Sequence, residues 1–388
     1  MSKSNETTPN VPTLRFGGFS DLWNKSTIEK NAKVYDGTHQ TPIYTKSGVK
    51  FVSVENIKDL YSSDKYISIE DYNSDFKYVP EINDILMTRI GDIGTPALVT
   101  KSEPLAYYVS LALLKEIDLE PHFLYHYIQT APFQKELWRR TLHVAFPKKI
   151  NKNEIGDCAI FYPSTRCEQK KVALFLDGIE KRIKIQNKII SKYETLIKGI
   201  RHRIFGSICG EKQSSLGGFL EEYSEKNVAN NLQSVAVGKY GIRKREEIYS
   251  KELSADYSKN KVIRKNTLII GMGSTQIDIG ILTTDDCYCV SPAYTTYRIK
   301  GINSFYLQEY LIELNPLLSV RYMITSARQG KAVNKEDLMK HLMTIHSESE
   351  QKEICKCFEN LYSRLQIEKE MLSALQKQKA FLLQSMFI

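Results

Sequence analysis

Hydrophobic residues recur between positions 168 and 205 at steps that alternate four and three. They are Val172, Leu176, Ile179, Ile183, Ile190, Tyr193, Ile197, Ile200 and Ile204, with polar Gln186 in one slot of the pattern. This narrow spacing is typical of a coiled-coil seam, whereas a helix packed on a globular core has a broader apolar stripe. A helix of this length would extend roughly 57 Å. The pattern therefore predicts a long helix that reaches beyond one compact domain.

The same pattern returns 182 positions later. Both stretches begin with Glu-Gln-Lys, at Glu168 and at Glu350, and the polar slot at Gln186 returns at Glu368. The second seam consists of Ile354, Phe358, Leu361, Leu365 and Leu372. Two unrelated amphipathic helices are the alternative, but they would not be expected to share a start and a polar slot. We interpret the chain as a tandem duplication, each copy a globular part followed by a long helix.

The two seams predict that the long helices pair antiparallel with each other. Gln186 and Glu368 lie almost at the helix midpoints, and only midpoints face their own equivalents in an antiparallel pair with pseudo-two-fold symmetry. Val172 should then approach Met386. A polar residue at a seam position lowers stability but fixes register and orientation, so we expect Gln186 and Glu368 to be neighbours.

Runs of β-branched and alternating residues predict strands in both globular parts. The expected strands cover residues 49–57, 84–89 and 97–99 in the first copy, and 235–237, 262–263, 267–270, 277–282 and 296–299 in the second. Helices are expected at 121–138, 305–314 and 320–328. The predicted fold class is α+β: two mixed α/β domains in tandem, separated by two long antiparallel coiled-coil helices.

Composition and charge restrict the kind of protein. Hydrophobic residues make up 42% of the 388 positions, and Lys and Arg outnumber Asp and Glu by 54 to 45, a net charge of +9. The chain can bury cores, and its moderate positive charge suits a polyanionic partner. The seven cysteines and seven histidines are scattered. We therefore expect reduced thiols, no metal site and a cytoplasmic protein without a membrane span.

The sequence lacks the motifs of common catalytic sites. No glycine-rich phosphate loop with a Lys-Ser or Lys-Thr pair occurs, and Gly271-Met272-Gly273 lacks the third glycine of a dinucleotide fingerprint. We therefore expect no catalytic residues in this chain.

Basic residues instead gather in predicted loops with aromatic neighbours. Loops of this kind can contact phosphates and read base edges, and an ordinary charged surface is the alternative. The predicted DNA-binding residues in these loops are Arg139, Arg140, Lys148 and Lys149 in the first copy, and Lys239, Tyr240, Arg243, Lys244, Arg245, Arg328 and Lys331 in the second.

A second apolar strip lies beside each seam. It consists of Phe175, Ile185 and Ile189 on the first helix, and of Cys357, Ile367 and Met371 on the second. Because a two-helix rod needs only one seam, the second strip predicts a docking surface for a partner protein. Alternatively, the second strip packs against the globular parts of the chain.

With these features, the chain resembles the specificity subunit of Type I restriction–modification enzymes. The matching features are Leu14-Arg15-Phe16 with Trp23, the loop Asp36-Gly37-Thr38-His39 to Pro42 that leads to Phe51 and Ile57, Gly91-Asp92-Ile93-Gly94, and the Glu-Gln helix starts at Glu168 and Glu350. The resemblance covers nearly the whole chain, although the second copy lacks the Asp-Gly-Thr-His loop. We also predict that Thr38, His39 and Thr41 of this loop bind DNA. Arg89, at the end of the strand expected at 84–89, is predicted to do the same.

The resemblance implies a division of labour along the chain. Target recognition domains, expected at 1–165 and 207–346, would each read half of a split, asymmetric site in double-stranded DNA. Spacer helices, expected at 166–206 and 347–388, would also dock the methyltransferase (modification) subunits, two in number, beside motor-nuclease (restriction) subunits.

Cofactors would belong to these partners: S-adenosylmethionine to the adenine-N6 methyltransferase, and ATP and Mg²⁺ to the motor nuclease. The chain itself would hold no cofactor and no active site. Two other functions remain open, a stand-alone DNA-modifying enzyme and a coiled-coil scaffold that binds only protein. Turnover by the purified chain would favour the first, and salt-dependent DNA binding by the complex would argue against the second.

Overall fold

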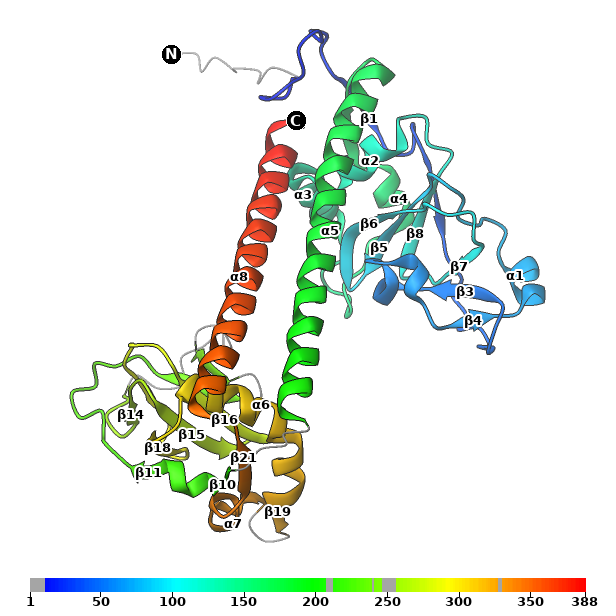
Figure 1. Cartoon of the computed structure of the whole chain (residues 1–388). Helices are drawn as coiled ribbons and strands as arrows, with labels where there is room; N and C mark the ends of the chain where they lie inside the picture. Colours follow the sequence, from blue (N-terminus) through cyan, green and yellow to red (C-terminus); the bar gives the residue numbers. More distant parts are fainter. Residues whose placement is uncertain (1–10, 207–211, 239–240, 246–255, 327–329) are drawn as a thin grey trace. The chain divides into compact units, whose positions relative to one another are not determined.

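The computed structural model describes residues 11–206, 212–238, 241–245, 256–326 and 330–388 (Figure 1). The chain forms two compact units: unit 1 contains residues 1–187 and 370–388, and unit 2 contains residues 188–369. Two long helices, α5 (Arg166–Phe205) and α8 (Glu348–Ser385), each contribute one part to unit 1 and the other part to unit 2. Among the described helices, none combines the length and the apolar composition that a membrane crossing requires.

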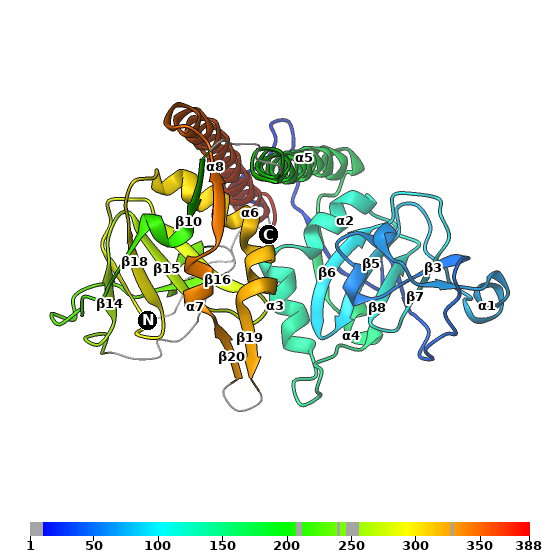
Figure 2. The same ribbon diagram turned by 60° about the horizontal axis from the view of Figure 1, so that its bottom comes forward.

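Unit 1 is built around a four-stranded antiparallel sheet in the order β2-β8-β5-β6, joined by a three-stranded sheet, β4-β3-β7, and the pair β1-β9. Its elements before α5 are β1 (Asn24–Thr27), β2 (Lys33–Asp36), β3 (Val49–Val52), η1 (Val54–Asn56), η2 (Leu60–Ser62), β4 (Tyr66–Ile67), α1 (Ile69–Asp75), β5 (Ile85–Ile90), β6 (Asp92–Leu98), β7 (Leu105–Tyr107), β8 (Leu111–Lys115), α2 (Pro121–Ile128), α3 (Ala131–Arg140), α4 (Lys152–Gly156) and β9 (Ala159–Tyr162). Figure 2 shows α2 and α3 beside β6.

The central strand β5 is buried on both faces, which explains its continuous apolar sequence. Ile85 and Met87 belong to the larger core cluster together with Phe123 of α2. Leu86, which points to the opposite face, belongs to a second cluster together with Tyr107. The sheet of unit 1 is therefore covered on both faces and supports the loops at its strand ends.

Unit 2 repeats this topology. Its main sheet has the order β11-β18-β15-β16, and its pair β10-β21 corresponds to β1-β9. Its elements are β10 (Lys212–Ser215), η3 (Leu216–Phe219), β11 (Leu220–Tyr223), β12 (Val235–Gly238), β13 (Gly241–Lys244), β14 (Lys261–Ile263), β15 (Thr267–Met272), β16 (Ile277–Leu282), β17 (Tyr288–Val290), β18 (Thr295–Ile299), α6 (Ser304–Tyr322), β19 (Met323–Ser326), β20 (Gly330–Val333), α7 (Lys335–Met339) and β21 (Leu342–Ile345). The shared strand order supports the predicted duplication.

The two glutamines of the repeated helix start have the same contacts in both units. Gln169 Nε2 donates to the Pro163 carbonyl (2.9 Å), and its Oε1 accepts from the N–H of Glu120, the residue that precedes α2 (2.9 Å). Gln351 Nε2 donates to the His346 carbonyl (3.0 Å), and its Oε1 accepts from the N–H of Asn303, the residue that precedes α6 (3.5 Å). Each glutamine ties the start of a long helix to the globular part before it.

Within each unit, α5 and α8 run antiparallel. In unit 1, Val172 and Met386 belong to one buried cluster, and Lys379 Nζ lies 2.5 Å from a Glu180 carboxylate oxygen. In unit 2, the C-terminal end of α5 lies against the N-terminal part of α8. The rings of Phe205 and Phe358 stack there with centroids 6.3 Å apart. The predicted helix direction is thus confirmed.

The polar seam residues fall in different units, Gln186 in unit 1 and Glu368 in unit 2. Gln186 is buried and Glu368 is half-buried. Their predicted meeting stays a prediction. The remaining seam residues are buried or half-buried, as a seam requires: Leu176, Ile179, Ile183, Ile190, Ile354, Leu361, Leu365 and Leu372.

Several expected elements differ from the structure. The helix expected at 305–314 continues to Tyr322 as α6, and the strand expected at 97–99 is the end of the longer β6. The helix expected at 121–138 is two helices, because Thr130 caps α3 by accepting a hydrogen bond from the Phe133 N–H (3.4 Å). The strand expected at 49–57 ends at Val52, where a capping box starts a 3₁₀ turn. The helix expected at 320–328 is correct to Tyr322 and wrong at 323–326, where Ile324 and Thr325 favour a strand that pairs with β20, while residues 327 and 328 lie outside the described residues.

Candidate nucleic-acid interface

The loop after β2 in unit 1 is held by its backbone. The Thr38 N–H donates to the Tyr107 carbonyl (3.1 Å), and the Thr38 carbonyl accepts from the Val109 N–H (2.9 Å). Gly37 is necessary for this approach, because a Cβ there would lie 2.5 Å from the Tyr107 carbonyl oxygen. The side chains of His39 and Thr41 are exposed. The loop therefore presents two predicted DNA-binding side chains from a fixed backbone.

Arg89 differs from the other predicted DNA-binding residues of unit 1 because it is buried, with 6% of its surface exposed. Its guanidinium forms an ion pair with Asp36 at the start of this loop. Its Nε donates to the Ile150 carbonyl (3.0 Å), and its own carbonyl accepts from the Ile150 N–H (3.0 Å). Arg89 therefore ties the loop after β2 and the segment after α3 to the same strand, β5.

The segment after α3 forms a closed loop, residues 141–149, which we term the apex loop. Its ends pair through the Leu142 N–H and the Lys149 carbonyl (2.8 Å), and the Lys148 carbonyl accepts from the Gly91 N–H (2.8 Å). Lys148 and Lys149 are exposed. The apex loop thus presents two predicted DNA-binding lysines next to the turn between β5 and β6.

The two arginines at the end of α3 share an acidic partner. Arg139 is exposed and pairs with Glu136, and Arg140 Nε lies 2.8 Å from a Glu136 carboxylate oxygen. Arg140 also reaches Glu154 of α4 (3.2 Å). This contact gives Arg140 a structural role in joining α3 to α4, while Arg139 lies at the surface.

Sequence reasoning missed the apolar residues of the apex loop. Val144 is 99% exposed and Phe146 is 102% exposed. Trp138, at the base of the loop, lies under the Lys148 ammonium (4.2 Å from the ring centroid) and beside the His143 ring (4.5 Å). The only sequence signal was the apolar run from Val144 to Phe146 inside a basic segment.

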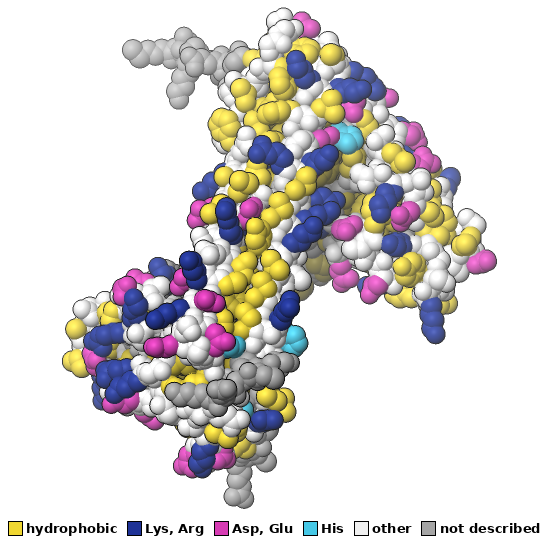
Figure 3. Space-filling model, viewed as in Figure 1, with side chains coloured by type: hydrophobic (Ala, Val, Ile, Leu, Met, Phe, Trp, Pro, Cys, Tyr) yellow, Lys and Arg dark blue, Asp and Glu magenta, His cyan; other side chains and the backbone are white. Residues whose placement is uncertain are grey.

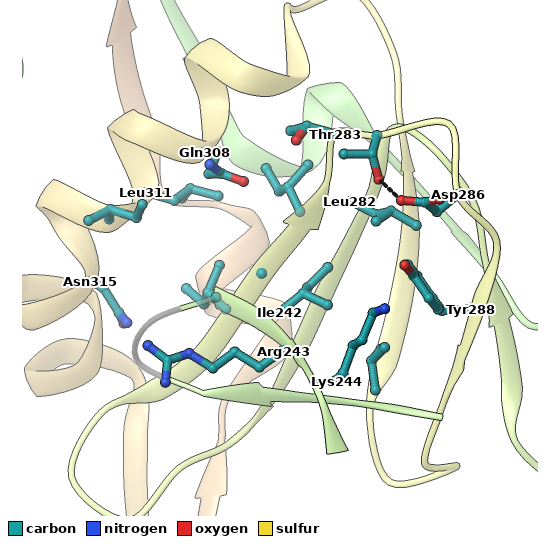
Figure 4. A pocket seen from close by; sticks show the side chains of 17 residues that line it. Ile242, Arg243, Lys244, Leu282, Thr283, Asp286, Tyr288, Gln308, Leu311 and Asn315 are labelled. Carbon is teal, nitrogen blue, oxygen red and sulfur yellow. Dashed lines mark hydrogen bonds between the residues drawn. The ribbon is translucent and has the colours of Figure 1, made fainter. Parts of the chain in front are cut away.

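In unit 2 the described predicted residues lie on or directly after strand β13 and on strand β20, so the loop expected around Lys331 is a strand. Arg243 and Lys244 on β13 are exposed and line a hollow of about 370 Å³ between this hairpin, β16 and α6 (Figure 4). Arg245 follows β13 and is half-buried. Lys331 is exposed, and its Nζ donates to the Ser274 carbonyl. The predicted residues Lys239, Tyr240 and Arg328 lie outside the described residues.

The strand that carries Arg89 in unit 1 carries Gly271 at the matching position of unit 2. A Cβ on Gly271 would lie 2.2 Å from the Tyr294 ring, so this ring occupies the space of a side chain. The Tyr294 hydroxyl donates to the Val237 carbonyl of the hairpin (3.1 Å). An arginine supports the loop in unit 1, whereas a tyrosine supports the hairpin in unit 2.

The histidines that come together in unit 1 hold helices rather than a ligand. One carboxylate of Asp177 on α5 lies 2.7 Å from His122 and 2.8 Å from the buried His126, both on α2. Its contact raises the pKa of His122. Although burial opposes the change, the two histidines lower the pKa of Asp177 well below its usual range. Among the described residues, no cluster of His, Cys, Asp and Glu is arranged to hold a metal ion.

The second apolar strip of the long helices is at the surface. Phe175 and Ile185 of α5, and Ile367 and Met371 of α8, are exposed large hydrophobic residues, and Ile189 is half-buried. Figure 3 shows hydrophobic side chains along the visible faces of the long helices. Phe175 also packs edge-to-face on Phe16 (5.7 Å between ring centroids). The strip is thus available to a partner, apart from the part of Phe175 that Phe16 covers.

Comparisons with known proteins agree with this arrangement. The profile of the Type I restriction modification DNA specificity domain matches residues 14–195. The fold is similar to the crystal structure of a Type I restriction–modification S subunit from M. genitalium, with a TM-score of 0.60, 15% identity, and coverage of 97% of this chain and 99% of that chain. It is also similar to a chain from a study of complex assembly and conformational transition in a type I R-M system, with a TM-score of 0.56, 14% identity, and coverage of 93% and 96%.

The matched domain lies in the first repeat, and the repeated sheet order and the paired long helices extend the similarity in fold to the whole chain. Residues 14–195 thus match a Type I restriction modification DNA specificity domain, and the chain as a whole has a fold similar to that of a Type I restriction–modification S subunit.

Proposed function

We propose that this chain is the DNA-recognition subunit of a Type I restriction–modification complex. It reads a bipartite, asymmetric site in double-stranded DNA and directs partner subunits to methylate or cleave. One observation carries the proposal: the same sheet order occurs twice, and each copy supports a different set of loops. As a specificity subunit, the chain is not itself the catalyst. S-adenosylmethionine, ATP and Mg²⁺ act in its partners, in the cytoplasm.

The two units hold their loops in different ways, and this favours half-sites of different sequence. Unit 1 fixes its loop through the ion pair of the buried Arg89 with the half-buried Asp36, whereas unit 2 fixes its hairpin through Tyr294 next to Gly271. Base readout depends on which side chains a loop projects into a groove. Two loop sets on one repeated sheet therefore give a site whose halves differ. We assign the recognition domains to residues 1–165 and 207–346, with the spacers at 166–206 and 347–388.

An exchange of the second recognition domain tests this function. Residues 212–345 are replaced by the matching segment of a related specificity subunit, so that the graft closes at the Lys212–Ile345 strand pair. We expect methylome sequencing of a host that expresses the hybrid and its methyltransferase partner to show one half of the bipartite motif changed and the other half unchanged. The original chain, expressed with the same partner, is the control. A change in both halves, or a motif that is not bipartite, would contradict the proposal.

The exposed strip on the long helices is the proposed docking surface for two methyltransferase subunits. Ile185→Asp combined with Ile367→Asp places two charges on this surface, and burying an unpaired charge in an interface is strongly unfavourable. We expect the methyltransferase subunit to be lost on copurification, with the circular dichroism spectrum unchanged. Ile69→Asp combined with Leu342→Asp is the matched control, since both residues are exposed and lie off the long helices. A retained stoichiometric complex would refute this assignment.

A further inference from the structure

The apex loop exposes two large apolar side chains completely. Val144 and Phe146 have 99% and 102% of their surface exposed, more than any other large hydrophobic residue among the described residues. Exposed hydrophobic residues are common, but they usually keep part of their surface covered. A fully exposed phenyl ring at the tip of a loop gains free energy when a partner buries it.

The loop that carries these side chains has a fixed base. Backbone hydrogen bonds join Leu142 to Lys149 and Gly91 to Lys148, both at 2.8 Å. Trp138 fills the base between the Lys148 ammonium and the His143 ring, and a His143 ring nitrogen lies 3.0 Å from the Trp138 carbonyl. Because the base is tied at several points, the apolar tip is held away from the core and is ready to enter a partner.

The charge around the tip indicates what the partner is. Residues 135–152 contain six Lys and Arg residues (Lys135, Arg139, Arg140, Lys148, Lys149 and Lys152) and one acidic residue, Glu136. Arg139 and Arg140 are paired with Glu136, and Arg140 also with Glu154, but Lys148 and Lys149 beside the tip are exposed. An apolar tip next to exposed cations matches a duplex, in which phosphates lie outside and stacked bases lie within. A hydrophobic pocket on another protein would not require this excess of positive charge.

We propose that Phe146 inserts between two bases of the half-site bound by unit 1 and opens that base step. The inference rests on the proposed function. It adds that Phe146 makes binding depend on how easily one base step unstacks. Lys148 and Lys149 would hold the flanking phosphates, while the phenyl ring replaces a lost base neighbour by stacking. Sequence preference at that step then follows from its deformability, since pyrimidine–purine steps open most easily.

The test uses the full chain in complex with its methyltransferase subunits and a duplex carrying the methylated motif. The fluorescent base 2-aminopurine is placed in turn at each position of the unit 1 half-site that accepts it. We expect fluorescence to rise on binding at positions next to one step, and Phe146→Ala to abolish the rise. Affinity should fall about tenfold, as expected for one base–aromatic stack, with an unchanged salt slope. Phe146→Trp should restore both signals.

Leu22→Ala is the control, because Leu22 is also a strongly exposed apolar residue of unit 1. Unchanged fluorescence and affinity in Phe146→Ala would overturn the wedge. So would the loss of the methyltransferase subunit from this variant, since the ring would then contact protein. Failure of the unmodified complex to bind its motif would instead refute the proposed function. Should Phe146→Ala not fold, Phe146→Leu serves in its place, and a retained fluorescence rise with unchanged affinity in that variant would contradict stacking.

Discussion

Glu309→Ala is expected to destabilise unit 2 by about 3–5 kcal/mol, the usual cost of removing one partner from a buried ion pair. Glu309 on α6 is fully buried, and its carboxylate lies 2.8 Å from the Arg201 guanidinium of α5. The Tyr362 hydroxyl of α8 donates to the same carboxylate (3.1 Å) and accepts from Arg201 (2.7 Å). Without Glu309, the buried Arg201 charge loses its counter-charge at the place where three helices meet.

Denaturant unfolding of the purified chain measures this loss. Glu313→Ala is the matched control, because Glu313 lies on the same helix and pairs with the exposed His202 (2.8 Å). An exposed pair contributes less than about 1 kcal/mol. The double variant Arg201→Met with Glu309→Leu should recover much of the stability, since it removes both charges and keeps the volume. A loss below about 1 kcal/mol in Glu309→Ala would show that water reaches Arg201.

Lys148→Ala combined with Lys149→Ala is expected to weaken DNA binding by the complex about thirtyfold at 0.15 M salt, because each lost phosphate contact removes about one counterion from the release that drives binding. The slope of log K against log salt should fall by about two. These lysines give a cleaner test than Arg139 and Arg140. The arginines share Glu136, so their removal would leave an unpaired carboxylate.

Lys77→Ala combined with Lys101→Ala provides the control, with the same change in net charge. Both are exposed lysines of unit 1 that lie over tyrosine rings, Lys77 over Tyr78 and Lys101 over Tyr61. Titration at several salt concentrations should show the unmodified slope for this control. An equal fall in slope for both pairs would mean that only total charge matters and that the apex loop has no special place in the interface.

The long helices could be predicted from sequence because their pattern is local and long. A seam that is buried on one side leaves the same periodic signal over many turns, and α5 and α8 begin within two residues of the expected positions. The doubly buried strand β5 was also recognisable, since its apolar run is flanked by Asp84 and Gly91. The hydrophobic pattern is sufficient to predict an element when burial repeats regularly along the chain.

The loops could not be predicted with the same success, because their environment depends on residues far away in the sequence. Arg89 looked like a surface residue, and only the fold brings Asp36 beside it. The sequence pattern makes no prediction for Phe146, and only the fold shows that it is fully exposed. Only the first strand of the β12–β13 hairpin was expected, and the second strand begins at Gly241, which has a φ of +84°.

The two ends of the described chain meet in unit 1. The Leu14 N–H donates to the Ser385 carbonyl (2.8 Å), and the Thr13 hydroxyl donates to the same oxygen (3.1 Å). Unit 2 is thus an insertion whose chain leaves and returns through the two long helices. Because residues near the two ends of the described chain are in contact, the same fold is compatible with a different order of the repeats. A gene that joined these ends and opened the chain after α5 would keep the contacts described above, so those contacts do not depend on which repeat comes first in the chain.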